Sequence, residues 1–306
     1  MSSLNQVTAS SQTPVAIFAY RRPNHLRRTL DALARNHGAD QTNVTVICDG
    51  PRSPGEASDC RSVVREAGRA RPFNSITVEQ RESNLGLARS IVGGTSQMLH
   101  QHERVIVLED DIVTSPAFLT YMNDALERYS ADDRVISVHG YSYPTKIQEP
   151  FFLRGADCWG WATWRRGWEL FDPDGASLLK RLREQALTDA FDFNGAYPYT
   201  RMLEDQIAGR NDSWAIRWYA SAFLADKLTL YPGRCLVQNI GHDGSGTHGG
   251  ATDRFEGDLA QQAPDLSGVV VEESAAARSA FERYFRERDS CGPVRLDSPR
   301  LLVRVL

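Results

Sequence analysis

The chain has 306 residues, of which 41% are hydrophobic and 24% are charged, and its net charge at neutral pH is −4. This composition is ordinary for a globular protein, and because no basic stripe dominates it we expect no nucleic-acid partner. The cysteines are odd in number and lack CxxC spacing, which argues against a zinc site and a disulfide framework and favours a reducing compartment.

Apolar runs and polar turns alternate along residues 14–140. We expect strands at residues 14–20, 43–51, 75–81, 104–111 and 134–140, and helices at residues 25–36, 84–99 and 115–129. In the last helix, Ser115 is the expected N-cap and Pro116 the first helical residue. The alternation predicts a doubly wound α/β fold with a mostly parallel sheet, in which ligands bind at the carboxyl edge of the strands.

The second half of the chain has a different character, since all six tryptophans lie between residues 159 and 218. Residues 170–212 are polar and read as short helices, and residues 212–232 as a helix that starts at Asp212 or Ser213 and is followed by a short strand. Residues 241–253 are too rich in glycine for anything but a loop, and residues 271–289 form a charged helix.

No apolar run reaches the roughly 18 residues of a membrane span. The first dozen residues are polar and lack the apolar core of a signal peptide, so we expect residues 1–13 to be a flexible lead-in and the protein to be cytoplasmic. The tail at residues 300–306 and the arginine-bearing helix before it could contact the inner face of an anionic membrane, but a solvated helix and a packed terminal strand are the favoured interpretations.

Three acids, Glu109, Asp110 and Asp111, directly follow the apolar run at residues 105–108. Adjacent like charges cost stability unless a cation lies among them. Carboxylates at the mouth of a parallel sheet suit a hard divalent cation that completes its shell with phosphate oxygens. The same three acids could also form an acidic turn before the next helix. The motif alone does not distinguish this turn from a cation site.

Two further strands also end at charged residues that could bind parts of a nucleotide. Asp49 ends the second strand, where it can accept hydrogen bonds from a ribose or a base, or form a simple Asp-Gly turn. Arg21 and Arg22 end the first strand, where they can face phosphates or solvent. The three ends taken together indicate a binding site for a charged ligand.

The ordered segments FAYRRP, VICDGP, NLGLARSIVGG and VIVLEDDIVTSPAFLTYM resemble the GT-A glycosyltransferases, specifically N-acetylglucosaminyltransferase I and its bacterial relatives. The segments FFLRGADCWGWATWRRGWELF, NDSWAIRW and GSGTHGG extend the resemblance to about residue 250. It implies a GT-A (Rossmann-like) α/β fold with a nucleotide-sugar-binding half at residues 14–140, an acceptor-binding and catalytic half at residues 141–270, and a C-terminal helix and tail at residues 271–306.

The resemblance also implies an inverting, metal-dependent transfer of a sugar from a nucleotide sugar. UDP and N-acetylglucosamine are the implied nucleotide and sugar. The implied roles are Asp111 as ligand of Mn²⁺ or Mg²⁺, Glu109 and Asp110 on the ribose and donor sugar, Asp49 on the nucleoside, Arg21 in the donor site, and Asp212 as general base.

Several of these roles have competitors. Asp212 reads equally as a helix N-cap, and Glu204 and Asp205 form an acid pair that could supply the base instead. His248, which matches the family's loop histidine, could touch the diphosphate or complete the metal shell, as could His242; an exposed loop histidine is the plain alternative.

Tryptophan rings stack on sugars, so we expect Trp159 or Trp161 near the acceptor, with Trp164 and Trp168 packing a helix. The expected acceptor is a glycan or lipid-linked glycan of surface polysaccharide or lipid-linked oligosaccharide assembly. Two rivals remain, a sugar-1-phosphate nucleotidyltransferase, which normally has a glycine-rich loop after its first strand, and a non-catalytic carbohydrate-binding module.

Overall fold

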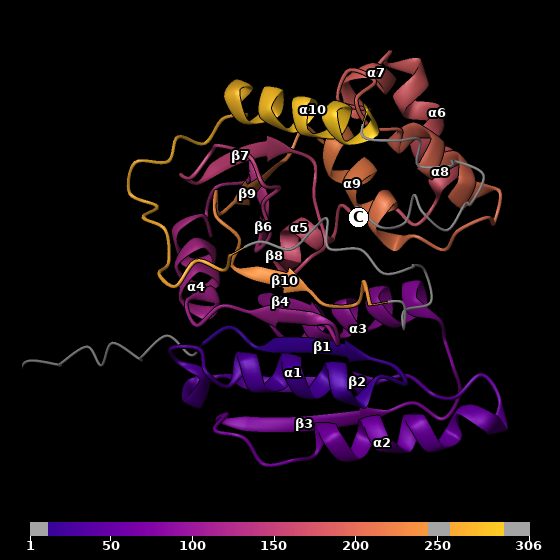
Figure 1. Ribbon diagram of the computed structural model, residues 1–306. Coiled ribbons are helices and arrows are strands. Elements are labelled where there is room, and N and C mark those ends of the chain that lie inside the picture. Colours follow the sequence, from indigo (N-terminus) through magenta and orange to yellow (C-terminus); the bar gives the residue numbers. More distant parts are fainter. Residues whose placement is uncertain (1–11, 244–257, 291–306) are drawn as a thin grey trace, which may run out of the picture.

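The computed structural model describes residues 12–243 and 258–290. Its first half builds four parallel strands, which lie side by side in the order β3, β2, β1, β4 (Figure 1). Their bounds are β1 Val15–Ala19, β2 Asn43–Cys48, β3 Ser75–Gln80 and β4 Arg104–Glu109. All five residues of β1 are buried, because a central parallel strand is covered on both faces.

The second half continues the same sheet in the order β8, β6, β9, β7. Strand β8 is antiparallel to both β4 and β6, β6 is parallel to β9, and the edge strand β7 is antiparallel to β9. The bounds are β6 Val135–His139, β7 Phe151–Arg154, β8 Trp161–Trp164 and β9 Leu228–Tyr231. The expected α/β fold with a mostly parallel sheet is therefore confirmed.

A second, two-stranded sheet lies at the end of β4. It pairs β5 (Ile112–Thr114) with β10 (Val237–Asn239) in antiparallel register, so that Asn239 lies opposite Ile112. This short pairing was not expected from the sequence. It brings residues 237–243 to the acids that follow β4, although more than a hundred residues separate the two segments.

Helices surround the sheet within the described residues (Figure 1). Their bounds are α1 Pro23–Leu33, α2 Ala57–Ala67, α3 Leu87–Gln101, α4 Phe118–Arg128, α5 Arg165–Trp168, α6 Gly175–Glu184, α7 Thr188–Phe191, α8 Tyr199–Ile207, α9 Trp214–Leu224 and α10 Ala275–Ser290, with 3-10 turns η1 Ala39–Gln41 and η2 Pro54–Glu56. Figure 1 shows α10 running above the edge strand β7, and Ser274, just before it, donates its backbone N–H to the carbonyl of Phe152.

Strand β8 shows how the two faces of the sheet are covered. Successive side chains on a strand alternate between faces, so Trp161 and Trp164 point to opposite sides. The indole N–H of Trp164 donates to the carbonyl of Leu126 in α4 at 3.1 Å, whereas the ring of Trp161 lies against Trp218 of α9. Helices α4 and α9 therefore lie on opposite faces of the sheet.

The glycine pair within α3 has a packing role. A Cβ atom on Gly94 would lie 2.5 Å from the ring of Phe18 and 2.7 Å from the side chain of Ile47. Helix α3 can approach β1 and β2 this closely only because residue 94 has no side chain. The helix predicted at residues 84–99 is thus present, but its first residue is Leu87.

The predicted cap of the helix after β4 is wrong. Helix α4 starts at Phe118 with Ala117 as its N-cap, and the hydroxyl of Ser115 accepts the N–H of Ala117 at 3.2 Å in the turn before it. Ser115 is instead held in the small sheet by its own N–H, which donates to the carbonyl of Leu236 at 2.8 Å. The helix therefore starts two residues later than expected, after a segment that pairs with a distant part of the chain.

Candidate functional site

The carboxyl ends of β1, β2 and β4 meet at one edge of the sheet, because these neighbouring strands are parallel. Asp110 connects two of them: its carboxylate accepts the backbone N–H of Tyr20 at 3.2 Å, and its own carbonyl accepts the hydroxyl of Thr29 in α1 at 2.8 Å. The chain therefore holds the acids that follow β4 against the turn that follows β1.

Arg22 provides the positive charge in this acidic cluster. One guanidinium nitrogen, Nη2, donates to Oδ1 of Asp110 and also to Oδ2 of Asp111, the latter at 2.7 Å. The side chains are 20% exposed for Arg22, 4% for Asp110 and 11% for Asp111. Screening by water is weak at this burial, so these contacts are strong charge-assisted hydrogen bonds.

One guanidinium does not balance three acids. Burial, and then the charges of Asp111 and Asp110, raise the pKa of Glu109 well above its ordinary range, although Arg22 opposes this. Burial likewise raises the pKa of Asp110, although Arg22 lowers it. Burial alone would lower the pKa of Arg22, but Asp110 and Asp111 raise it above the ordinary value. The cluster is short of positive charge, and a further cation would relieve it.

Gly241 borders the same carboxylate. The N–H of Ile240 donates to the carbonyl of Asp111 at 2.8 Å, which continues the β5–β10 pairing. A Cβ atom on Gly241 would lie 2.1 Å from Oδ2 of Asp111 and 3.0 Å from Nη1 of Arg22. Only glycine lets the backbone come this close while leaving the carboxylate in place.

Two observations suit a divalent cation at this corner. The available donors are carboxylate oxygens, and the guanidinium of Arg22 already lies between two of them, where a cation would lie. Within residues 12–243 and 258–290, no three His, Cys, Asp or Glu side chains converge as a metal site.

Asp49 holds a loop of the protein itself. Its carboxylate accepts the backbone N–H groups of Leu85, at 2.9 and 3.2 Å, of Gly86 at 3.1 Å and of Gly50 at 3.0 Å. Asp49 is 7% exposed. Besides any contact with a nucleoside, this side chain anchors the turn before α3, a role that the sequence analysis did not assign.

Arg21 lies beside the cluster in a strained backbone conformation. Its φ is 53°, which is uncommon for a residue with a side chain and occurs often at functional sites. Its guanidinium pairs with Glu56, which also accepts the phenol hydroxyl of Tyr20. The guanidinium carbons of Arg21 and Arg52 lie 5.3 and 5.4 Å from the centroid of the Tyr20 ring. Two cations and one ring thus line this side of the edge.

Asp212 lies at the same edge, on the far side of the Asp49 loop. The cap of α9 is Ser213, whose hydroxyl accepts the N–H of Ile216 at 3.2 Å, so Asp212 is not needed as a cap. Oδ2 of Asp212 lies 3.8 Å from the position of a Cβ on Gly86. Asp212 is exposed, and among the described residues its carboxylate accepts no hydrogen bond and forms no ion pair, although its charge acts on Arg217 and raises the pKa of that guanidinium against the effect of burial.

The two competing acids are committed to arginines. Asp205 is 2% exposed and pairs with Arg201 at 3.2 Å and Arg210 at 2.5 Å. Glu204 pairs with Arg183 at 2.7 Å on the outer side of α8. Both carboxylates are therefore paired with arginines of the helical subregion around α8.

The two candidate acceptor tryptophans lie in different surroundings. Trp161 is 1% exposed, and its ring centroid lies 5.4 to 6.1 Å from those of Trp168, Trp214 and Trp218. These four rings form a cluster in the core. Trp161 could contact an acceptor only if this cluster opened.

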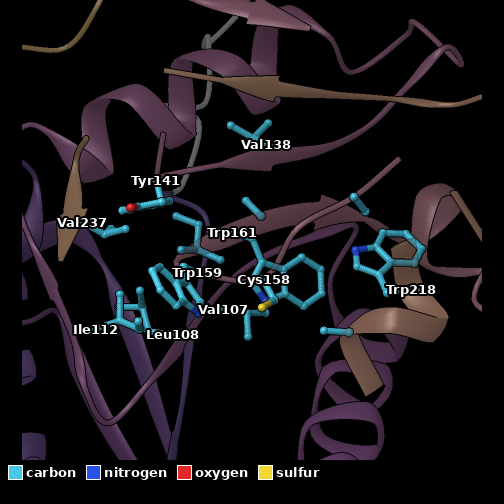
Figure 2. Packing of buried hydrophobic residues seen from close by; sticks show 14 of the residues in the cluster. Val107, Leu108, Ile112, Val138, Tyr141, Cys158, Trp159, Trp161, Trp218 and Val237 are labelled. Atoms are coloured by element: carbon cyan, nitrogen blue, oxygen red, sulfur yellow. The ribbon is translucent and has the colours of Figure 1, made fainter. Parts of the chain in front are cut away.

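Trp159 is also buried, at 6% exposed, but it lies beside the site. Figure 2 shows its ring near Leu108, Ile112 and Val237, the residues that flank the acids and the small sheet. Its centroid is 5.5 Å from that of His242, the residue after Gly241. The positive φ of Gly160, +60°, lets the chain turn directly after this ring.

The loop histidines are only partly placed. His248 lies outside the described residues. The segment before it is anchored, since His25 in α1 lies 3.1 Å from a carboxylate oxygen of Asp243. Arg22 was expected from the sequence to face phosphates or solvent, whereas the structure pairs it with Asp110 and Asp111, and Gly241 was not singled out from the sequence at all. The signal for Arg22 was present in the RRP turn, but nothing local marks Gly241.

Comparison with known proteins gives one family match. Residues 11–138 match the family described as glycosyltransferase like family 2, and this range contains β1 to β4, the acids and most of β6. The match favours sugar transfer over the nucleotidyltransferase and binding-module rivals. No curated protein matches the sequence significantly.

Two solved structures give weak matches to this chain. A mannosyltransferase of Pyrobaculum calidifontis, solved with GDP-Man and Mn²⁺, is 16% identical, with a TM-score of 0.40 over 71% of this chain and 70% of its own. Residues 1–349 of S. aureus TarS are 13% identical, with a TM-score of 0.40 over 74% of this chain and 59% of that one. At this level of similarity neither neighbour assigns a substrate.

Proposed function

We propose that this chain, a glycosyltransferase on the strength of the match over residues 11–138, transfers a sugar with inversion from a nucleoside-diphosphate sugar to a hydroxyl of a glycan acceptor. The observation that carries the proposal is the meeting, at one sheet edge, of the Asp110–Asp111 cluster, the cationic turn after β1 and the uncommitted carboxylate of Asp212.

In the proposed reaction, the acceptor oxygen forms a bond to the anomeric carbon while the bond from that carbon to the diphosphate breaks. The electron pair leaves with the diphosphate, and Asp212 takes the proton of the attacking hydroxyl. A single displacement of this kind inverts the anomeric configuration. Asp212 suits the base because it is exposed and unpaired among the described residues, unlike Asp205 and Glu204.

The leaving diphosphate needs positive charge. Arg21 and Arg22 at the end of β1 can supply part of it, as can the start of α1, whose first residue is Pro23. A divalent cation, Mn²⁺ or Mg²⁺, would be held by Asp111 and, when bound, would neutralise the charge that develops on the leaving phosphate. Glu109 and Asp110 would then face the ribose and the donor sugar.

A UDP-sugar, with N-acetylglucosamine as its sugar, is the first donor to test, because the sequence resemblance implies it. Trp159 would stack on the acceptor, since its ring lies next to His242 at the site. No helix in the described part of the chain is long and apolar enough to cross a bilayer. A growing surface polysaccharide or lipid-linked oligosaccharide, reached from the cytoplasm, is the acceptor class we propose.

The test screens UDP- and GDP-sugars for Mn²⁺-dependent stabilisation against heat and then for transfer, with the anomeric configuration of the product read by NMR. Asp212→Asn should bind donor as the wild type does and lose transfer about 10²–10⁴-fold, the usual contribution of a general base. Glu204→Gln is the matched control and should keep transfer. Retention of configuration, or a normal rate in Asp212→Asn, would contradict the mechanism.

A further inference from the structure

The contacts of Arg22 raise a question about the metal site that rests on the proposed function. Nη2 of Arg22 bonds to Oδ2 of Asp111 at 2.7 Å, and the backbone at Gly241 closes on the same oxygen. With Arg22 in this position, a metal on that oxygen would lie almost in contact with a guanidinium. Both groups are cations in a site that water screens poorly, so they repel each other strongly.

We propose that Arg22 and the divalent cation exclude each other at Asp111, and that the donor's diphosphate is the anion that draws Arg22 away. Arg22 is then an exchangeable counter-ion: it neutralises Asp111 until metal and diphosphate arrive together, and afterwards it bonds to the diphosphate.

The geometry allows this exchange with a small movement. Arg22 bonds to Asp110 as well as to Asp111, so its guanidinium can keep the first bond while it releases the second. Asp110 is held independently by the N–H of Tyr20 and does not depend on Arg22 for its position. Guanidinium groups bind phosphate oxygens at least as well as carboxylates, through two parallel hydrogen bonds.

The charges in the cluster favour the same order of events. Among the described residues, Arg22 is the one cation that forms ion pairs with Asp110 and Asp111. If Arg22 simply left, three adjacent acids would stand without a counter-charge. A dication that arrives with a diphosphate replaces the lost positive charge and gives Arg22 a new partner, so neither step is favourable without the other.

The proposal predicts coupling between two ligands. Mn²⁺ alone should bind the wild type weakly, and UDP should raise the affinity for Mn²⁺ at least tenfold; by linkage, Mn²⁺ should raise the affinity for UDP by the same factor. Replacing Arg22 by glutamine removes the competitor, so Arg22→Gln should bind Mn²⁺ alone at least tenfold more tightly than the wild type. The enhancement by UDP should shrink in this variant.

The experiment is a titration of the full-length protein with Mn²⁺, in which the free ion is measured by electron paramagnetic resonance, with and without UDP. Arg27→Gln is the matched control, because Arg27 lies on the same helix, is exposed and contacts only Asn24 in the described structure. It should bind Mn²⁺ like the wild type. Arg22→Lys keeps the charge and should retain weak binding of Mn²⁺ alone.

Two outcomes would overturn the inference. One is a folded Arg22→Gln variant that binds Mn²⁺ alone no more tightly than the wild type. The other needs no variant: equal affinity of the wild type for Mn²⁺ with and without UDP. If both hold while Mn²⁺ still binds and transfer proceeds, the counter-ion exchange fails and the proposed function stands. If no protein binds Mn²⁺ under any condition, the metal site of the proposed function fails with it.

Discussion

Replacing Asp49 by alanine separates two roles of that carboxylate, nucleoside binding and support of the loop before α3. The side chain is 7% exposed and accepts the backbone N–H groups of Leu85, Gly86 and Gly50 at 2.9 to 3.2 Å. A hydrogen bond to a charged group contributes about 1.5–3 kcal/mol, and a buried donor that loses its partner costs about 1–3 kcal/mol. Leu85 and Gly86 are only half-buried, so water would replace part of what is lost.

We therefore expect Asp49→Ala to lower the free energy of unfolding by about 2–4 kcal/mol, less than the sum of the separate bonds. The measurement is urea unfolding without nucleotide, followed by UDP binding. Asp40→Ala is the control, since Asp40 is exposed in the short turn η1 and should change stability by no more than about 0.5 kcal/mol.

A stable Asp49→Ala variant that loses UDP binding would refute the loop-anchoring role and leave nucleoside recognition alone. A destabilised variant should show a second effect. The loop that Asp49 holds includes Gly86, next to Asp212, so transfer at saturating donor should also fall.

Two further predictions concern the buried interior. Burial raises the pKa of Asp157 to about 7, although the hydrogen bonds from the N–H of Cys158 and the hydroxyl of Tyr231 oppose this rise. Asp157 therefore contributes most to the stability of the folded state below its unfolded pKa of about 4. This contribution is lost as the pH rises to about 7. Relative to the wild type, Asp157→Asn should gain stability over that range by up to about 1.4 kcal/mol per pH unit in urea unfolding, and a difference that is constant with pH would count against it. Trp161→Ala should lower the free energy of unfolding by about 3–5 kcal/mol, because Trp161 packs within a tryptophan cluster. A loss of stability below about 1 kcal/mol, together with a raised KM for the acceptor, would instead place the Trp161 ring at the substrate.

Much of the fold was predictable because the signals are local. The strand expected at residues 43–51 is β2, Asn43–Cys48, and the one expected at residues 134–140 is β6, Val135–His139. Each is a short apolar run that a polar turn ends, and parallel pairing then places the polar ends together. The position of the acids at a strand end follows from this pattern without knowledge of any partner.

Other features could not be read locally. Ser115 looked like a helix cap, but its N–H pairs with Leu236, and the helix begins three residues later at Phe118. Trp159 and Trp161 are two residues apart, look alike in sequence and are both buried, yet Trp159 lies beside His242 whereas Trp161 packs against Trp214. The small sheet of β5 and β10 and the core of tryptophans decide these outcomes, and both join distant segments.

The sequence by itself determined that the chain builds a mostly parallel α/β sheet and that acids gather at its carboxyl edge, because strand length, apolar content and turns are properties of neighbouring residues. Only the tertiary structure decided which charges face each other. Arg22 meets Asp110 across 88 positions of sequence, and Gly241 closes on Asp111 through a pairing of strands that lie still further apart in the sequence. The energy of such contacts depends on the distance between the charges and on their burial, and neither can be deduced from the local sequence.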